Sequence, residues 1–179
     1  ATINDIAAKL GVSKSTVSKA LNNATDISEE MRKRILETAV ELGYVNRRLQ
    51  KKEKKLCILV ANMDYDTPNQ FGYDIVIGFK QMAEPEGWTI DTIPLTKEFQ
   101  RLTPYGVFMM EHGYQAAFVM GFSLLDPWIE EFRTTRIPTV LYDNYVKDNP
   151  HVASIGCDSQ EGFNLAVRHL VKLGHKKIG

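Results

Sequence analysis

The chain has 179 residues, of which 44% are hydrophobic and 25% are charged, and its 22 Lys and Arg residues are balanced by 22 Asp and Glu residues. It contains neither a signal-peptide pattern nor an apolar run long enough to cross a membrane, so we expect a soluble cytoplasmic protein. The neutral total hides a split, because residues 1–55 hold 12 basic and 7 acidic residues while the remainder is acidic. This asymmetry indicates that only the N-terminal part meets a polyanion.

Residues 3–23 are predicted to form two short helices joined by a tight turn. Thr2 and Asp5 have the spacing of a capping box at the start of the first helix. Gly11 follows that helix, where a left-handed residue commonly ends a helix, and Ser13 is placed to cap the second one. The pattern is typical of two helices that cross closely around a glycine turn.

The outer face of the second helix is short and polar, and consists of Lys14, Ser15, Ser18, Lys19 and Asn22. Such a face suits the major groove of DNA, where short polar groups meet base edges and phosphates. The alternative is the solvated face of a small helical bundle. The helix pair, the glycine turn and the polar face occur together, and this combination favours DNA recognition.

These residues resemble the helix-turn-helix headpiece of the lactose-repressor (LacI/GalR) family of bacterial transcription regulators. The family's pattern is present at Thr2–Ala7, Gly11–Ser13, Thr16–Ser18 and Leu21–Asn22. The resemblance implies base contacts from Lys14, Ser15 and Lys19. It also implies contacts, mainly with phosphates, from Ser13, Thr16, Ser18, Asn22, Ser28 and Tyr44.

A third helix is predicted from Ser28 to Gly43, with Glu29 and Glu30 at its positive N-terminal end. It would complete a helical DNA-binding headpiece over residues 1–45. Residues 46–55, NRRLQKKEKK, then form a basic linker. The linker is either solvated or attracted to the DNA backbone through Arg47, Arg48, Lys51 and Lys52. The family inserts a leucine from this stretch into the minor groove, but Leu49 lies too early for that pattern, so backbone attraction is the preferred interpretation.

From residue 56 the pattern changes to short apolar runs that alternate with helical stretches. Strands are predicted at 56–62, 88–95, 115–121, 137–143 and 152–157, and helices at 71–83, 127–134 and 160–173, with a further helix ending near His112. This alternation predicts an α/β fold with an open, mostly parallel sheet covered on both faces.

The order of these elements resembles the N-terminal half of the family's effector domain, which shares the fold of periplasmic sugar-binding proteins. The ending HLVKLGHKKIG supports the resemblance. In that family the chain continues for about one further domain. We therefore expect residues 56–179 to be an incomplete lobe, and the chain to be a truncated regulator.

Ligands of open α/β sheets bind outside the carboxyl ends of the strands. Five residues are predicted to contact an effector there, namely Tyr65, Phe71, Phe122, Asn144 and Asp158. Aromatic rings stack on sugars, and amides and carboxylates bind hydroxyl groups. The alternative is that Asp and Asn at strand ends cap the following helices, and Asp158 with Ser159 fits that role.

No pattern for catalysis, a metal or a cofactor is present in the sequence. The chain lacks a phosphate loop, a nucleophile elbow and an acidic metal cluster, and its four histidines lack the spacing of metal ligands. Cys57 and Cys157 both lie in apolar runs, which predicts buried reduced thiols rather than a disulfide.

The sequence thus favours a dimeric repressor that binds a DNA operator and responds to a small-molecule effector, with a sugar favoured and a purine as the alternative. Two other functions remain open. The chain could be a constitutive DNA-binding dimer without an effector, or an α/β enzyme fused to a DNA-binding module.

Overall fold

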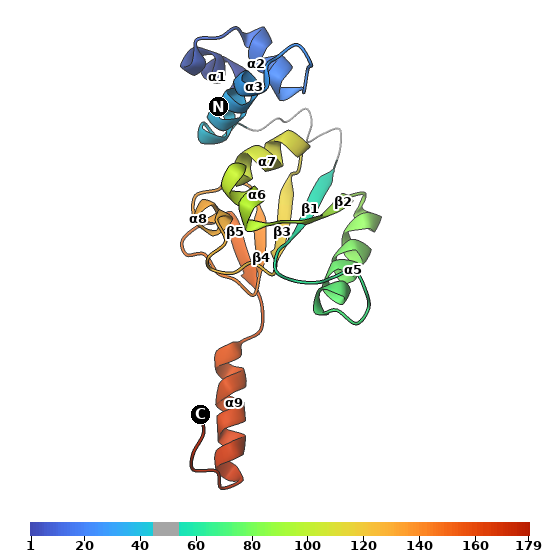
Figure 1. Ribbon diagram of the computed structural model, residues 1–179, viewed down its shortest axis with the longest axis vertical. Helices are drawn as coiled ribbons and strands as arrows, with labels where there is room; N and C mark the ends of the chain where they lie inside the picture. The colour runs from blue at the N-terminus through green and yellow to red at the C-terminus, as the bar shows by residue number, and fades with distance from the viewer. Residues whose placement is uncertain (45–53) are drawn as a thin grey trace.

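The computed structural model describes residues 1–44 and 54–179. The predictions for Arg47, Arg48, Leu49, Lys51 and Lys52 therefore lie outside the described residues. A cluster of three helices lies at one end of the molecule, a parallel sheet with its helices lies in the middle, and a single helix projects at the other end (Figure 1).

The N-terminal helices are α1 (Ile3–Leu10), α2 (Lys14–Leu21) and α3 (Glu29–Glu41). The capping box of Thr2 and Asp5 is present at α1, and Gly11 ends that helix with φ of 67°. Ser13 and Ser28 cap α2 and α3 by accepting hydrogen bonds from the backbone N–H groups of Thr16 and Met31. The core between the helices is fully enclosed, with no exposed surface on Ile6, Val17, Ala20, Ile35 and Ala39.

Five parallel strands form the sheet: β1 (Lys55–Val60), β2 (Thr89–Pro94), β3 (Ala116–Met120), β4 (Thr139–Tyr142) and β5 (Val152–Ile155). Their order across the sheet is β2-β1-β3-β4-β5. β1 is an interior strand that is paired on both sides, so that Cys57 lies level with Asp91 of β2 and Ala117 of β3. This position explains why β1 is continuously apolar from Leu56 to Val60 rather than alternating.

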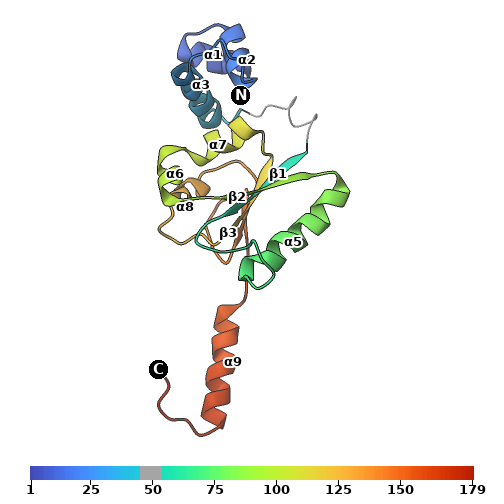
Figure 2. The same cartoon turned by 45° about the vertical axis from the view of Figure 1, so that its right-hand side comes forward.

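The helices around the sheet are α5 (Phe71–Ala83), the 3₁₀ turn η1 (Glu84–Glu86), α6 (Lys97–Leu102), α7 (Tyr105–His112) and α8 (Trp128–Phe132). α5 covers one face, where Val76 packs with Ile58, Val60 and Phe118. α6, α7 and α8 cover the other face (Figure 2), and there Trp128 and Phe132 are completely buried. The predicted helix–strand alternation and parallel sheet are confirmed.

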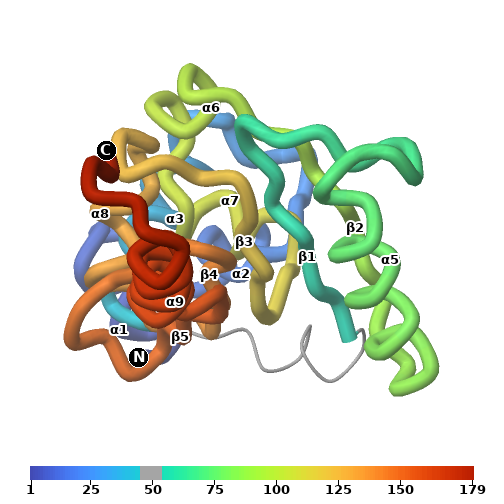
Figure 3. The backbone as a smooth tube through the Cα atoms, turned by 90° about the horizontal axis from the view of Figure 1, so that it is seen from below, coloured from blue at the N-terminus to red at the C-terminus, as the bar shows by residue number. Residues whose placement is uncertain are grey.

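The last helix, α9 (Ser159–Lys172), has no buried residue. It projects from the β4–β5 side of the sheet, away from α5 (Figure 3). Its Asp158 N-cap accepts a hydrogen bond from the Glu161 N–H at 3.0 Å. Apolar side chains such as Phe163, Val167 and Val171 are 70%, 44% and 58% exposed, respectively.

Two details differ from the sequence-based expectations. The segment before His112 forms two helices instead of one, because Thr103 ends α6 in an extended conformation and Pro104 caps α7. Both cysteines are free, as predicted, but only Cys57 is buried. Cys157 is exposed because β5 ends at Ile155, so the thiol lies beyond the sheet. No helix in the described ranges is long and apolar enough to cross a membrane.

Candidate nucleic-acid interface

The exposed face of α2 carries the residues predicted to read DNA bases. Lys14, Ser15 and Lys19 are all exposed, whereas Val17 and Leu21 of the same helix are buried in the headpiece core. The helix is therefore fixed by its apolar side and presents short polar and basic groups on the other. Within the described part of the chain, Lys14 makes no hydrogen bond or ion pair, so its ammonium group is free to meet an acceptor.

The hydroxyl groups at the start of α2 hold the helix in place. The Ser13 Oγ accepts from the Thr16 N–H at 3.0 Å and lies 2.9 Å from the Thr16 hydroxyl. At the other end, the side-chain amide of Asn22 donates to the Ser18 carbonyl at 2.7 Å. These predicted phosphate-contacting residues therefore also cap both ends of the helix that carries the base-reading lysines.

An acidic residue that sequence analysis missed lies beside the predicted base-reading surface. The Lys19 ammonium forms an ion pair with the Asp26 carboxylate in the turn before α3. The hydrogen bond from Lys19 lowers the pKa of the Asp26 carboxyl below its ordinary value. The pairing joins two elements across a turn, and no local sequence pattern indicates it. Asp26 thus engages one of the two lysines on the predicted base-reading face of α2.

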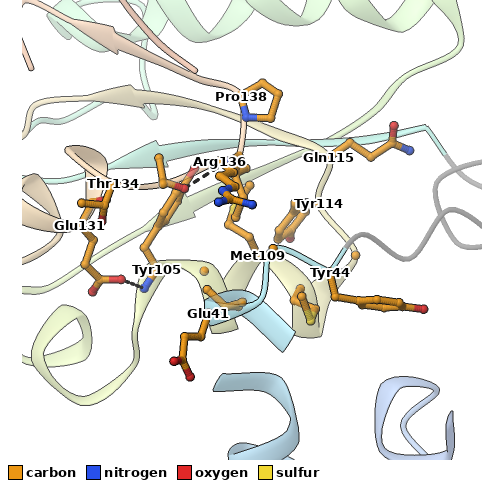
Figure 4. Close-up of a pocket in the computed structure, with 17 residues that line it drawn as sticks. Glu41, Tyr44, Tyr105, Met109, Tyr114, Gln115, Glu131, Thr134, Arg136 and Pro138 are labelled. Carbon is orange, nitrogen blue, oxygen red and sulfur yellow. Dashed lines mark hydrogen bonds between the residues drawn. The ribbon is translucent and has the colours of Figure 1, made fainter. Parts of the chain in front are cut away.

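The two remaining predicted contacts lie on α3 and after it. Ser28 is exposed and accepts from the Met31 N–H at 3.3 Å as the N-cap of α3. Tyr44 is partly buried against the headpiece core and also lines a cavity next to α7 (Figure 4). Arg47 and Arg48 lie outside the described residues.

At the carboxyl ends of the strands, a buried carboxylate organises the loops. The Asp126 carboxylate accepts hydrogen bonds from Gln100 Nε2 at 2.9 Å, Ser123 Oγ at 2.7 Å and Asn62 Nδ2 at 3.3 Å. Burial alone would raise the pKa of Asp126, but the hydrogen bonds from Ser123 and Gln100 outweigh it and lower the pKa. Sequence analysis predicted no such network, because its members come from three separate segments, namely the loop after β1, helix α6 and the loop after β3.

The predicted effector-binding residues lie in two groups around this edge. Phe71 is 67% exposed at the start of α5, and its ring centroid lies 6.4 Å from that of Tyr142 at the end of β4. Tyr65 is partly buried beside the same helix start, where a Cβ on Gly72 would lie 3.0 Å from the Tyr65 Cβ. The structure therefore places three aromatic rings at one corner of the edge.

The second group contains Phe122, Asn144 and Asp158. Phe122 is only 8% exposed, and its ring packs in the core with its centroid 5.9 Å from that of Phe132. Asn144 Nδ2 donates to the Phe122 carbonyl at 3.1 Å. Asp158 caps α9, which is the alternative role that its neighbour Ser159 suggested. In the parts of the chain that the structure describes, no three His, Cys, Asp or Glu side chains gather as a metal site.

Residues 2–46 match the family model described as bacterial regulatory proteins, lacI family. The chain is 28% identical over 184 residues to the HTH-type transcriptional repressor PurR of Aliivibrio salmonicida (strain LFI1238), covering 100% of this chain and 54% of that protein. It is 29% identical over 184 residues to the probable HTH-type transcriptional repressor ExuR of Bacillus subtilis (strain 168), covering 99% and 53%. The chain thus spans about half the length of the curated relatives that it matches.

Among solved structures, the chain is similar to a transcriptional regulator CelR–cellobiose complex. The TM-score is 0.52 at 22% identity, and the match covers 100% of this chain and 54% of that one. At this level of identity the likeness concerns the fold. It agrees with the order of elements described above, in which three helices precede a parallel α/β sheet.

A helix-turn-helix headpiece with a polar, basic second helix, followed by a parallel α/β lobe, defines a DNA-binding protein of the regulator class. Residues 2–46 carry the helix-turn-helix headpiece of the lacI family of bacterial regulatory proteins, and the curated relatives that match over the whole chain are HTH-type transcriptional repressors. The resemblance predicted from the headpiece motifs is therefore confirmed.

Proposed function

We propose that this chain is the operator-binding part of a transcriptional repressor, which acts in the cytoplasm as a homodimer and is controlled by a small-molecule effector. The observation that carries the proposal is the face of α2, where Lys14, Ser15 and Lys19 are exposed on a helix whose other side is locked in a closed core. The domain division that goes with it is a headpiece at 1–45, a linker at 46–55 and a lobe at 56–179.

In this proposal, α2 enters the major groove of DNA. Lys14 and Lys19 donate to guanine acceptors, and Ser15 adds a short contact that specifies little. Ser13, Thr16, Ser18, Asn22, Ser28 and Tyr44 contact mainly phosphates, and Arg47 and Arg48 add backbone attraction. A dimer presents two such helices to the two halves of a near-palindromic operator.

The effector is proposed to bind at the carboxyl edge of the sheet, with a sugar favoured over a purine. Tyr65 and Phe71 offer rings that can stack on the apolar face of a sugar, and the Asn144 amide offers hydrogen bonds to its hydroxyls. Phe122 contributes through its carbonyl and its packing, and Asp158 through its position as the N-cap of α9. The related CelR structure was solved with cellobiose. The proposal assigns no catalytic role to any residue.

The test is fluorescence anisotropy with a labelled duplex selected from a random library by this protein, compared with a scrambled duplex over a salt series. We expect tighter binding of the selected duplex and a near-palindromic consensus. Lys14→Ala should lower the affinity for the selected duplex, at a cost of about 1–3 kcal/mol in discrimination. Lys33→Ala, on the exposed side of α3, is the matched control.

Two results would contradict parts of the proposal. Equal binding of selected and scrambled duplexes would exclude operator recognition. Specific binding that no sugar or purine changes, in a full-length protein that contains this sequence, would instead support a constitutive DNA-binding dimer.

A further inference from the structure

A cavity of about 450 Å³ lies between the headpiece and the sheet domain. Its headpiece wall is the end of α3 and the residues after it, including Val40, Gly43 and Tyr44. Its other wall is formed by α7 and the segment 134–138 (Figure 4). Gln115 and Pro138 precede β3 and β4, so the cavity lies at the amino edge of the sheet, opposite the proposed effector site.

The two walls are packed together rather than merely adjacent. Val107 of α7 is 6% exposed and belongs to the apolar core of the headpiece, with Met110 and Val40 packed against the same core. Gly106 permits this approach, since a Cβ there would lie 2.5 Å from the Val40 Cγ1. Gly43, with φ of 65°, lies against Arg136, whose Nη1 would lie 2.4 Å from a Cβ at Gly43.

The cavity offers one uncommitted cation. Within residues 1–44 and 54–179, the Arg136 guanidinium makes no hydrogen bond or ion pair. The nearby carboxylates are engaged elsewhere: Glu131 accepts from the Tyr105 N–H at 2.8 Å, and Glu41 pairs with Lys9 at 2.5 Å. Burial also raises the pKa of the Glu131 carboxyl, despite the hydrogen bonds that it accepts from the start of α7. Arg136, which is exposed, is therefore the basic side chain of the lining that is available to an anion.

The rest of the lining combines aromatic and thioether groups with polar side chains, among them Gln115, Thr134 and Thr135. Tyr105 and Met109 are completely buried, and Tyr114 is 8% exposed. Ligand cavities in proteins typically have about 300–1,000 Å³, mostly apolar walls and a few placed polar groups. A guanidinium binds a carboxylate in a planar, two-pronged geometry, and methionine adapts to flat apolar surfaces.

We propose that this cavity binds a small aromatic or otherwise planar carboxylate, with its acid group on Arg136 and its apolar ring against Met110, next to the buried Met109. Because the walls belong to the headpiece and to the sheet domain, the ligand holds the two together. Its binding and the docking of α3 on α7 then stabilise each other. The site is separate from the proposed effector site and does not depend on it.

The test uses 2-naphthoate as the probe and the chain labelled with ¹³C at its methionine methyl groups. Saturable shifts of the Met109 and Met110 signals are expected, while the signal of Met82, which is 76% exposed on α5, stays unchanged. Arg136→Gln should weaken binding by about tenfold or more, because a charge-assisted hydrogen bond is lost. The uncharged 2-naphthamide should bind correspondingly weakly.

Arg101→Gln is the matched control, because Arg101 is an exposed arginine on α6 outside the cavity lining. It should bind 2-naphthoate as the unmodified chain does. Absence of shifts at Met109 and Met110 would overturn the proposal. Equal affinity of Arg136→Gln and Arg101→Gln, or equal affinity for the acid and the amide, would overturn the role of Arg136. Shifts confined to Met82 would show binding to exposed apolar surface only.

Discussion

Two helices of similar length and similar local sequence signals have opposite environments in this molecule. α3 has 13 residues, a Ser28 N-cap and four buried residues, whereas α9 has 14 residues, an Asp158 N-cap and none. Both are amphipathic and both begin where a capping residue predicts. The comparison shows that caps and periodicity define where a helix forms, while burial depends on a complementary surface elsewhere in the fold.

The polar contacts also differ between the packed helices of the headpiece and the exposed helix α9. In the headpiece, side chains reach partners on other elements, as Lys9 does with Glu41 and Arg32 with the Ala24 carbonyl. Within residues 1–44 and 54–179, the cap at Asp158 is the only side-chain hydrogen bond of α9. The headpiece helices are thus held by contacts with other elements, whereas α9 is held by contacts within the helix itself.

The largest expected difference concerns the two cysteines. Cys57 lies in the interior strand β1 with no exposed surface, and burial strongly raises the pKa of its thiol. Cys157, between β5 and α9, is exposed. Iodoacetamide should therefore modify Cys157 in the native chain orders of magnitude faster than Cys57, because the thiolate is the reactive form. Peptide mass spectrometry over time measures both rates, with unfolded protein as the control. Equal native rates would mean that β1 is not enclosed.

Truncation of an apolar side chain should lower the free energy of unfolding far more on α3 than on α9. Ile35→Ala removes a completely buried side chain and should lower the free energy of unfolding of the headpiece by about 2–5 kcal/mol. Phe163→Ala, at a side chain that is 70% exposed, should change stability by less than about 0.5 kcal/mol. Urea titration followed by circular dichroism compares them. A loss of stability in Phe163→Ala as large as that in Ile35→Ala would show that α9 packs in solution.

The contact between α3 and α7 should respond to added volume. Gly106→Ala places a methyl group 2.5 Å from the Val40 Cγ1 and should cost about 1–3 kcal/mol through overpacking. Val40→Ala in the same chain should recover much of that loss, because it removes the opposing methyl groups. A double-mutant cycle by urea denaturation gives the coupling free energy. Additive effects would mean that the two helices do not touch.

The smallest expected effect concerns Asp26. Asp26→Asn releases Lys19 and should tighten binding of the selected DNA duplex by a small factor. Glu37→Gln makes an equal change of charge at a distant position, on α3, and should have less effect. The lowered pKa of Asp26 means that the ion pair persists above the ordinary pKa and is lost as pH falls through the lowered one. The difference between the two variants should therefore fade in acid. Anisotropy titrations at two pH values measure it, and identical affinities of both variants at neutral pH would show that Asp26 does not restrain Lys19.

Local patterns predicted most of the fold. Thr2, Gly11, Ser13 and Ser28 mark helix ends through chemistry within three residues, and each has the predicted role. The short apolar runs predicted all five strands for the same reason. Pro104 is a local signal for a helix break, but the surrounding residues continue a helical pattern and predict a single helix.

The features that sequence analysis missed join residues distant in the chain. Asp126 meets Gln100 and Asn62 only after the sheet has formed, and α3 meets α7 only once the headpiece docks. Apolar spacing alone could not separate Phe71, which is exposed, from Phe122, which is buried in the core. The DNA and effector contacts assigned to individual residues remain predictions.

The position of β1 has a mechanical consequence. The strand begins at Lys55, next to the linker, and ends just before Asn62, whose amide reaches the Asp126 network. Its neighbours on both sides fix its register, and a slip by one residue would turn every buried side chain to the opposite face. The strand therefore behaves as a stiff rod about 20 Å long. We therefore expect a displacement at the carboxyl end of β1 to move Lys55 at its other end only when the whole sheet tilts. The two ends of the sheet domain would then move together.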